Sequence, residues 1–119
     1  MGYESKLYVI EKGVHTDLDG RLFGMSVAMF DLCKVTNVAR AVHDSGTDTN
    51  CYFFVGDKKI IEDEYGEPLK ELSIPEMITI LEKAAEEESD YRRYAPCISL
   101  LKGFDLERWP NTVVLHYGH

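Results

Sequence analysis

Runs of apolar residues alternate with clusters of turn-forming residues along most of this chain. The first run, residues 6–12, is β-branched and aromatic with polar flanks, which is typical of a strand. A turn is expected at residues 17–20, since Asp side chains accept hydrogen bonds from nearby amides and Gly20 tolerates a positive φ. Residues 21–35 are almost continuously apolar. The pattern therefore predicts a hairpin whose second member is a central strand covered on both faces.

The middle of the chain predicts a connection followed by a second hairpin. Residues 36–50 are rich in Asp, Thr and Ser and favour a connection with one short helix around residues 38–42. In residues 51–63, two strand-like runs flank Gly56 and Asp57, and Gly in the first position of a two-residue loop matches a type II′ turn. Pro68 then argues against further pairing in the centre of a sheet.

A helix is predicted over residues 73–88. Ser73 can cap it while Glu76 reaches back to the cap, and Pro75 lies in the first turn, where no intrahelical donor is lost. Apolar residues keep the helical spacing at Ile74, Met77, Ile78, Leu81, Ala84 and Ala85. This stripe is expected to face the sheet and to leave the glutamates in water.

The last third of the chain completes the predicted fold. Pro96 is expected to begin a second short helix and Gly103 to end it, and residues 112–117 have strand composition. The order of elements predicts a single domain, residues 1–119, of the α+β class. We expect one antiparallel or mixed sheet of about five strands with two helices packed on one face.

Charge narrows the range of functions. Thirteen Lys and Arg against 21 Asp and Glu give a net charge of -8, which repels nucleic-acid phosphates and disfavours direct nucleic-acid binding. A negative surface suits a protein that competes with nucleic acid for a basic groove, because carboxylates can imitate phosphates. The alternative is that the charge only keeps the protein in solution.

Cysteine usage and hydropathy predict a cytoplasmic protein. Cys33, Cys51 and Cys97 are widely spaced among apolar neighbours, which favours reduced, buried thiols over a disulfide framework. We recognise no signal peptide, and no apolar run approaches the roughly 18 residues that a membrane span needs. No membrane partner is expected.

Candidate catalytic and metal-binding chemistry is sparse. Asp17 and Asp19 imitate the opening of a calcium loop, but its twelfth position would be Ala28, so a simple turn is preferred. His116 and His119 would point to opposite faces of a strand. We recognise no phosphate loop, nucleophile elbow or metal motif. The sequence therefore predicts no metal and no cofactor, names no catalytic residue, and favours a non-enzymatic role while leaving an enzyme open.

The best contact candidate is the basic aromatic cluster that follows the acidic helix, because Arg and Tyr supply interface anchors at low entropic cost. It consists of Tyr91, Arg92, Arg93 and Tyr94. Two acidic stretches complete the predicted binding set, Glu62, Asp63, Glu64 and Glu67 in one and Glu82, Glu86, Glu87, Glu88 and Asp90 in the other. The structural alternatives are local ion pairs for the arginines and a solvated hairpin edge for the first acidic stretch.

Segments throughout the chain resemble small uncharacterised proteins encoded by phages and prophages of Gram-positive bacteria. These segments are YESKLYV at 3–9, MFDLCKV at 29–35, DEYGEPL at 63–69, DYRRYAP at 90–96 and VLHYG at 114–118. The resemblance implies a genomic setting and not a reaction. Small acidic phage proteins of this kind often bind a host enzyme or defence component, so the resemblance raises the expectation of an inhibitor.

Three hypotheses follow from the sequence. The first is a phage-encoded acidic binding protein that inhibits a host protein, such as a defence or nucleic-acid-handling enzyme, with residues 91–94 at the centre of the contact. The alternative is a small-ligand binder, for example a sequestering oligomer for a nucleotide signal, in which Arg92 and Arg93 hold phosphate and a tyrosine stacks on the base. A structural homo-oligomer is the third.

Overall fold

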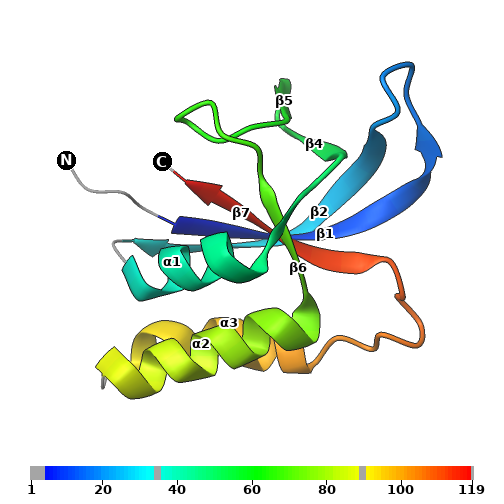
Figure 1. Ribbon diagram of the computed structural model, residues 1–119. Helices are drawn as coiled ribbons and strands as arrows, with labels where there is room; N and C mark the ends of the chain where they lie inside the picture. Colours follow the sequence, from blue (N-terminus) through cyan, green and yellow to red (C-terminus); the bar gives the residue numbers. More distant parts are fainter. Residues whose placement is uncertain (1–4, 34–35, 89–90, 119) are drawn as a thin grey trace.

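The computed structural model of the protein describes residues 5–33, 36–88 and 91–118 (Figure 1). The strands there are β1 (Ser5–Thr16), β2 (Leu22–Cys33), β3 (Thr47–Asp48), β4 (Cys51–Val55), β5 (Lys58–Ile60), β6 (Lys70–Ser73) and β7 (Thr112–Gly118). The helices are α1 (Thr36–Ser45), α2 (Ile74–Glu88) and α3 (Tyr91–Lys102). The α+β class is confirmed, with seven strands and three helices in this part of the chain instead of about five and two.

The strands form one strongly curled, mixed sheet in the order β3-β6-β7-β1-β2-β4-β5. All pairings are antiparallel except that of β2 with β4. β1 lies at the centre, between β7 and β2. The predicted strands all form, and the two that the sequence missed are β3 and β6, which adjoin each other at one edge. β6 begins two residues after Pro68, so the chain re-enters the sheet sooner than predicted.

Both predicted hairpin turns form. The β1–β2 turn is closed by the amide of Gly20, which donates to the carbonyl of Asp17 at 3.0 Å, and Gly20 has φ of 78°. The Asp17 carboxylate accepts hydrogen bonds from the amides of Asp19 and Arg21, each at 2.9 Å, which confirms a simple turn. In the β4–β5 turn, Gly56 has φ of 61°, the positive value that its position requires.

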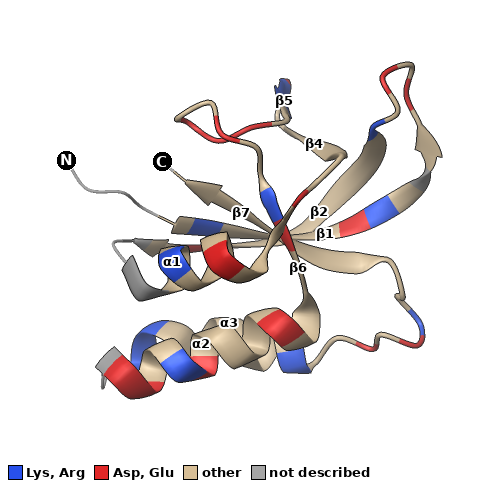
Figure 2. Ribbon diagram, in the orientation of Figure 1, with Lys and Arg blue, Asp and Glu red and all other residues tan. Residues whose placement is uncertain are grey.

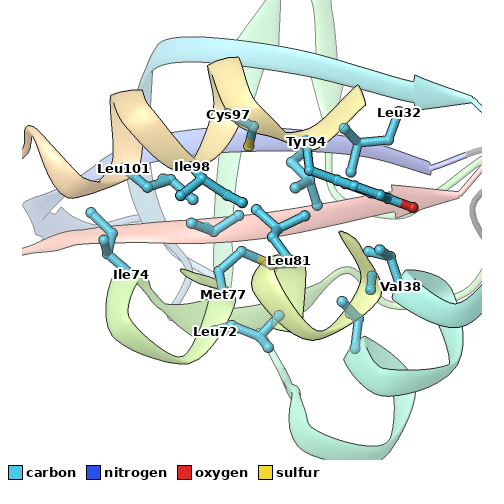
Figure 3. Packing of buried hydrophobic residues seen from close by; sticks show 14 of the residues in the cluster. Leu32, Val38, Leu72, Ile74, Met77, Leu81, Tyr94, Cys97, Ile98 and Leu101 are labelled. Atoms are coloured by element: carbon cyan, nitrogen blue, oxygen red, sulfur yellow. The ribbon is translucent and has the colours of Figure 1, made fainter. Parts of the chain in front are cut away.

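The three helices lie on one side of the sheet and cover the larger apolar core (Figures 1 and 3). The predicted apolar stripe of α2 is confirmed, since Met77 and Leu81 are fully buried in this core and Ile74, Ala84 and Ala85 are nearly so. Leu7 and Val9 of β1 enter it from the sheet. A second core on the other face contains Tyr8, Ile10, Cys51, Phe53, Ile60, Leu69, Leu115 and Tyr117.

Helix α3 begins five residues before its predicted start. Pro96 lies inside the helix and not at its first turn. Proline removes the hydrogen bond that its amide would donate to the carbonyl of Arg92, and Arg92 is exposed, so water can satisfy that carbonyl. Gly103 follows the last residue of the helix, as expected, and its amide donates to the carbonyl of Ser99 at 3.1 Å.

The prediction of a strand within residues 21–35 is confirmed, but the prediction that both of its faces are covered was wrong. β2 is a strand, but Met25, Val27 and Met29 are each about half exposed, at 62%, 48% and 49%. β4 pairs with β2 at only two positions and then diverges from it as the sheet curls. The apolar run therefore lies near an open edge.

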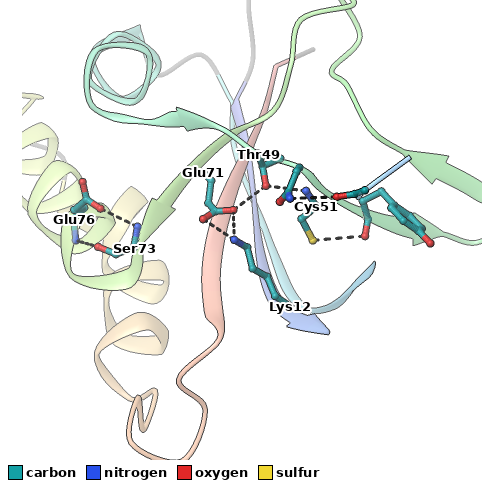
Figure 4. A network of polar contacts seen from close by, with 9 residues as sticks. Lys12, Thr49, Cys51, Glu71, Ser73 and Glu76 are labelled. Atoms are coloured by element: carbon teal, nitrogen blue, oxygen red, sulfur yellow. Dashed lines mark hydrogen bonds and ion pairs between the residues drawn. The ribbon is translucent and has the colours of Figure 1, made fainter. Parts of the chain in front are cut away.

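Polar contacts fix the sheet to the start of α2 (Figure 4). The Glu71 carboxylate accepts hydrogen bonds from the ammonium of Lys12 at 2.9 Å and the hydroxyl of Thr49 at 2.8 Å, which joins β1, β6 and the segment before β4. The capping box is confirmed: the amide of Glu76 donates to the Ser73 hydroxyl at 3.2 Å, and the amide of Ser73 donates to the Glu76 carboxylate at 3.1 Å. Among the residues described, no helix is long and apolar enough to span a bilayer.

Candidate functional site

A cavity of about 640 Å³ lies between α1 and the loop that connects β5 to β6. We call residues 62–67 the acidic loop and this space the acidic-loop cavity. Its charged lining residues are Asp48, Asp63, Glu67 and Lys70, with the imidazoles of His43 and His116. Ala39, Val42 and Pro68 give it an apolar side. Such a combination of apolar wall and convergent polar groups is typical of a binding site.

Backbone hydrogen bonds hold the acidic loop and the carboxylate of Asp63 in place. One oxygen of Asp63 accepts hydrogen bonds from the amides of Tyr65 at 2.8 Å and Glu67 at 3.0 Å, and the Glu67 carbonyl accepts one from the Asp63 amide at 2.9 Å. Gly66 takes φ of 76°, which the tight turn requires. The amide of Glu64 donates to the carbonyl of Gly118 at 3.0 Å and fastens the loop to β7. The Asp63 carboxylate is therefore positioned before any partner arrives.

His116 contributes a neutral ring to the cavity. Its side chain projects from β7, is 5% exposed, and its Nε2 lies 2.9 Å from the hydroxyl of Ser5. Burial lowers the pKa of His116 to about 4, although the nearby Asp63 carboxylate opposes the shift. Ser5 is 1% exposed and does not line the cavity, so its hydroxyl satisfies the buried imidazole and is not presented as a nucleophile.

The charge of the acidic-loop cavity is negative. Asp48, Asp63 and Glu67 supply three carboxylates against the single ammonium of Lys70. Lys70 lies 2.7 Å from Asp48, so these two charges offset each other. The negative charges of Asp63 and Glu67 are then not offset by another cation in the lining of this cavity. In the described part of the chain, no group of three His, Cys, Asp or Glu residues is arranged to hold a metal ion.

A second cavity of about 540 Å³ lies on the other side of Tyr65, which lines both. Tyr8 and Tyr117 form its walls, with ring centroids 6.2 Å apart in an edge-to-face arrangement. The Tyr117 hydroxyl donates to the Glu64 carboxylate at 2.7 Å, and the pKa of Tyr117 is raised by burial and by this acceptor. Lys6 and Lys58 also line the space.

The predicted basic aromatic cluster is divided by the helix that contains it. Tyr91, Arg92 and Arg93 are exposed at the start of α3, but Tyr94 is 0% exposed and packs in the larger core (Figure 3). The proposal of Tyr94 as a contact residue is therefore corrected, because a partner cannot reach it in the folded protein. Neither Arg92 nor Arg93 lines either of the two cavities above.

The two acidic stretches lie on opposite sides of α1 (Figure 2). Ala39, Val42 and His43 of α1 face the acidic loop, whereas Arg40, Ala41 and Asp44 border α2. Glu86 and Glu87 are exposed on α2, and Glu82 lies 3.4 Å from Lys102. The Glu88 side chain and all of Asp90 lie outside the described residues. The carboxylates thus form separate groups: the acidic loop borders the acidic-loop cavity with its two imidazoles, whereas Glu87 borders a smaller space of about 380 Å³ between α1 and α2.

Sequence reasoning found the acidic loop but missed the cavity beside it. α1, β3, β6 and β7 contribute the other walls, and these elements are far apart in the chain. Sequence reasoning also missed the exposed apolar side chains of β2 and β4. The available signal was the nearly continuous apolar run of residues 21–35, which is longer than one strand can bury when its neighbour diverges.

Comparison with protein-family models, with curated proteins and with solved structures finds no match to this chain.

Proposed function

We propose that this protein is a binding protein that takes a basic side chain of a partner protein into the acidic-loop cavity. The observation that carries the proposal is that Asp63, whose carboxylate is held by loop amides, and Glu67 line a space of about 640 Å³ together with an apolar wall. A lysine or arginine has an apolar stem and a charged head, so it can use both parts of this lining.

The net charge of -8 supports a basic partner. Long-range attraction raises the association rate of oppositely charged proteins, and a cavity lined by one sign of charge adds a local attraction. A protein that normally holds nucleic acid in a basic groove has suitable chemistry. In the phage setting that the resemblance suggests, occupation of such a groove would inhibit a host defence or nucleic-acid-handling enzyme.

The test compares two pairs of carboxylates in the otherwise unchanged protein. Asp63→Asn with Glu67→Gln removes two charges from the cavity, and Glu86→Gln with Glu87→Gln removes two from the exposed face of α2. The side-chain amide introduced by Asp63→Asn would keep an oxygen that can accept the two backbone amides of the loop. Both variants change the net charge equally, so a difference in affinity between them reports where on the protein the removed charges lie.

The probe is a short arginine-rich peptide, titrated by fluorescence anisotropy. We expect the cavity variant to bind the peptide about tenfold more weakly than the parent protein does, and the α2 variant to bind it nearly as tightly as the parent. Added salt should weaken peptide binding by both variants. Equal weakening by the two variants would show that the attraction is general and that the cavity is not the site. Binding that is insensitive to salt would also reject the proposal.

A second candidate function is the binding of a small aromatic ligand such as a nucleotide, which the second cavity favours. Tyr65 offers an exposed ring, and Lys6 and Lys58 offer ammonium groups. In this version of the nucleotide hypothesis, Lys6 and Lys58 take the phosphate-binding role that the sequence analysis gives to Arg92 and Arg93. Mass spectrometry of the purified, denatured protein tests it: a retained nucleotide supports this function, and a protein free of ligand weakens it.

A further inference from the structure

The acidic loop is a partition between the two cavities. Asp63 and Glu67 line the acidic-loop cavity, whereas Glu64 lines the second cavity. Tyr65 lines both, and its amide donates to the Asp63 carboxylate at 2.8 Å, so the backbone that carries its ring is held in place. In Figure 2 the loop, red over much of its length, projects from the body of the molecule between β5 and β6. Groups bound in the two cavities would therefore be separated by one aromatic side chain.

The lining of the second cavity suits an aromatic ring. Tyr8 and Tyr117 lie there edge to face and are nearly buried, whereas Tyr65 and Val55 are 54% and 47% exposed. Aromatic rings pack well against the edges and faces of other rings. A ring placed in this space would contact the buried tyrosine pair and remove the exposed surfaces of Tyr65 and Val55 from water.

The charges of the second cavity favour a neutral guest. Its charged lining residues are Lys6, Lys58 and Glu64. The ammonium of Lys58 lies 4.0 Å from the Glu64 carboxylate, and Asp31 is the residue opposite Lys6 in the pairing of β1 with β2. Each ammonium therefore has a carboxylate beside it, which offsets its attraction for a phosphate. An aromatic side chain needs no charged partner, so this balance suits it better than an anion.

We propose that the second cavity takes an aromatic side chain of the same partner protein whose basic side chain enters the acidic-loop cavity. The inference rests on the proposed function and deepens it by naming a pair of partner residues. Arginine and aromatic residues are the types that most often dominate binding energy at protein interfaces. Once the basic side chain is bound, the ring is held near its own cavity, so the joint affinity exceeds that of either contact alone.

Geometry suggests the spacing of the two partner residues. Side chains that contact opposite faces of the Tyr65 ring, each at about 3.5–4.0 Å, lie about 7–8 Å apart. In an extended segment, side chains two residues apart point to the same face and are separated by about 6.5 Å. Adjacent residues point to opposite faces and cannot straddle a ring. The partner segment should therefore be extended, with one residue between the basic and the aromatic residue.

The experiment compares three arginine-rich peptides on the unmodified protein by fluorescence anisotropy. The peptides have equal length and charge. The first has phenylalanine two positions after its last arginine, the second has serine there, and the third has phenylalanine directly after that arginine. We expect the first peptide to bind about tenfold more tightly than the second, and the third to lose most of this gain.

Two matched valines test whether the gain arises in the second cavity. Val55 lines this cavity, whereas Val27 lies on β2 and lines neither cavity. Their exposed fractions are 47% and 48%. Val55→Ser should reduce the ratio of affinities for the first and second peptides at least about threefold, because the ring loses an apolar contact. Val27→Ser should leave that ratio unchanged.

Photocrosslinking locates the ring without any protein variant. A benzophenone side chain replaces phenylalanine in the first peptide, and mass spectrometry maps the attachment on the unmodified protein. We expect attachment to residues that line the second cavity, such as Val55, Tyr65 or Tyr117. Attachment confined to other parts of the surface would overturn the inference.

Equal affinity for the phenylalanine and serine peptides would also overturn it, as would an equal gain at both phenylalanine positions. Those results leave the proposed function standing if the serine peptide still distinguishes the cavity variant, Asp63→Asn with Glu67→Gln, from the α2 variant. If the serine peptide binds both variants equally, the proposed function fails, whatever the ring contributes. The two failures are therefore distinguishable.

Discussion

Burial determines the protonation state of His116, and this has a consequence for stability. The pKa of His116 is about 4 in the folded protein, against 6.5 for an unperturbed imidazole. Above pH 6.5 the ring is neutral in both the folded and the unfolded state, so it adds no pH dependence there. Between pH 6.5 and 4 the unfolded chain binds a proton that the folded protein does not, so the free energy of unfolding falls as the pH falls.

The full effect of His116 should be roughly 3 kcal/mol, reached near pH 4. Urea unfolding of the parent protein and of His116→Gln at pH 7 and pH 4.5 measures it. We expect the parent to lose more stability than this variant over that interval. His43→Gln is the control, because His43 lines the same cavity but is exposed. Parallel losses in the parent protein and His116→Gln would show that His116 is not responsible.

At the scale of single elements, the capping box gives the sharpest agreement between sequence and structure. Ser73 and Glu76 exchange the two predicted hydrogen bonds at the start of α2. Ser73→Ala should lower the free energy of unfolding by about 1 kcal/mol, because the Glu76 amide then loses its protein acceptor. Ser99→Ala, an exposed position within α3, should change it by less than about half of that. Equal effects in thermal or urea unfolding would contradict the role of the cap.

Elements defined by local signals were predictable, and those defined by distant contacts were not. The caps, the turn glycines and the stripe of α2 depend on residues within a few positions of one another. β3 and β6 are short strands that become recognisable only because each lies beside the other and β6 lies beside β7. Both residues of β3 are exposed, and in β6 only Leu72 is buried, so neither strand shows the alternating pattern that marks a strand in a sequence.

The misplacement of α3 shows how one local signal can hide a stronger pattern. The sequence predicts Pro96 in the first turn, which places residues 91–95 outside the helix. With the helix starting at Tyr91, buried residues recur at helical spacing, at Tyr94, Cys97, Ile98 and Leu101. The earlier start of the helix also explains why the predicted contact cluster is divided. It places Tyr94 in the core and leaves Tyr91 exposed.

At the scale of the whole molecule, curvature of the sheet decides what is exposed. A long apolar strand next to β1 was predictable, but its burial depended on the path of β4, which pairs with β2 at two positions only. The cavity likewise depends on four elements that meet beside the acidic loop. The acidic loop itself was predictable because its charges are consecutive in sequence. The cavity and the open edge were not, since no local pattern encodes them.

The two cores share their central strands, so the molecule should unfold as one unit. In β1, Leu7 and Val9 face the helices while Tyr8 and Ile10 face the second core, and in β7 Val114 and Leu115 divide in the same way. Neither core can lose its strands without exposing the apolar residues of the other. This arrangement is expected to give a single cooperative transition.

Matched substitutions test this coupling. Leu81 lies in the helix-covered core and Leu69 in the second core, and both are at most 1% exposed. Each Leu→Ala substitution should lower the free energy of unfolding by roughly 2–5 kcal/mol, through lost burial and the cavity left behind. Far-ultraviolet circular dichroism reports the helices, and near-ultraviolet circular dichroism includes the packed rings of Tyr8 and Tyr117 in the second core. The two signals should show one coincident transition in the parent protein and in both variants. If Leu69→Ala instead produces an early near-ultraviolet transition while the helical signal persists, the second core unfolds separately, and the shared strands do not couple the two faces of the sheet.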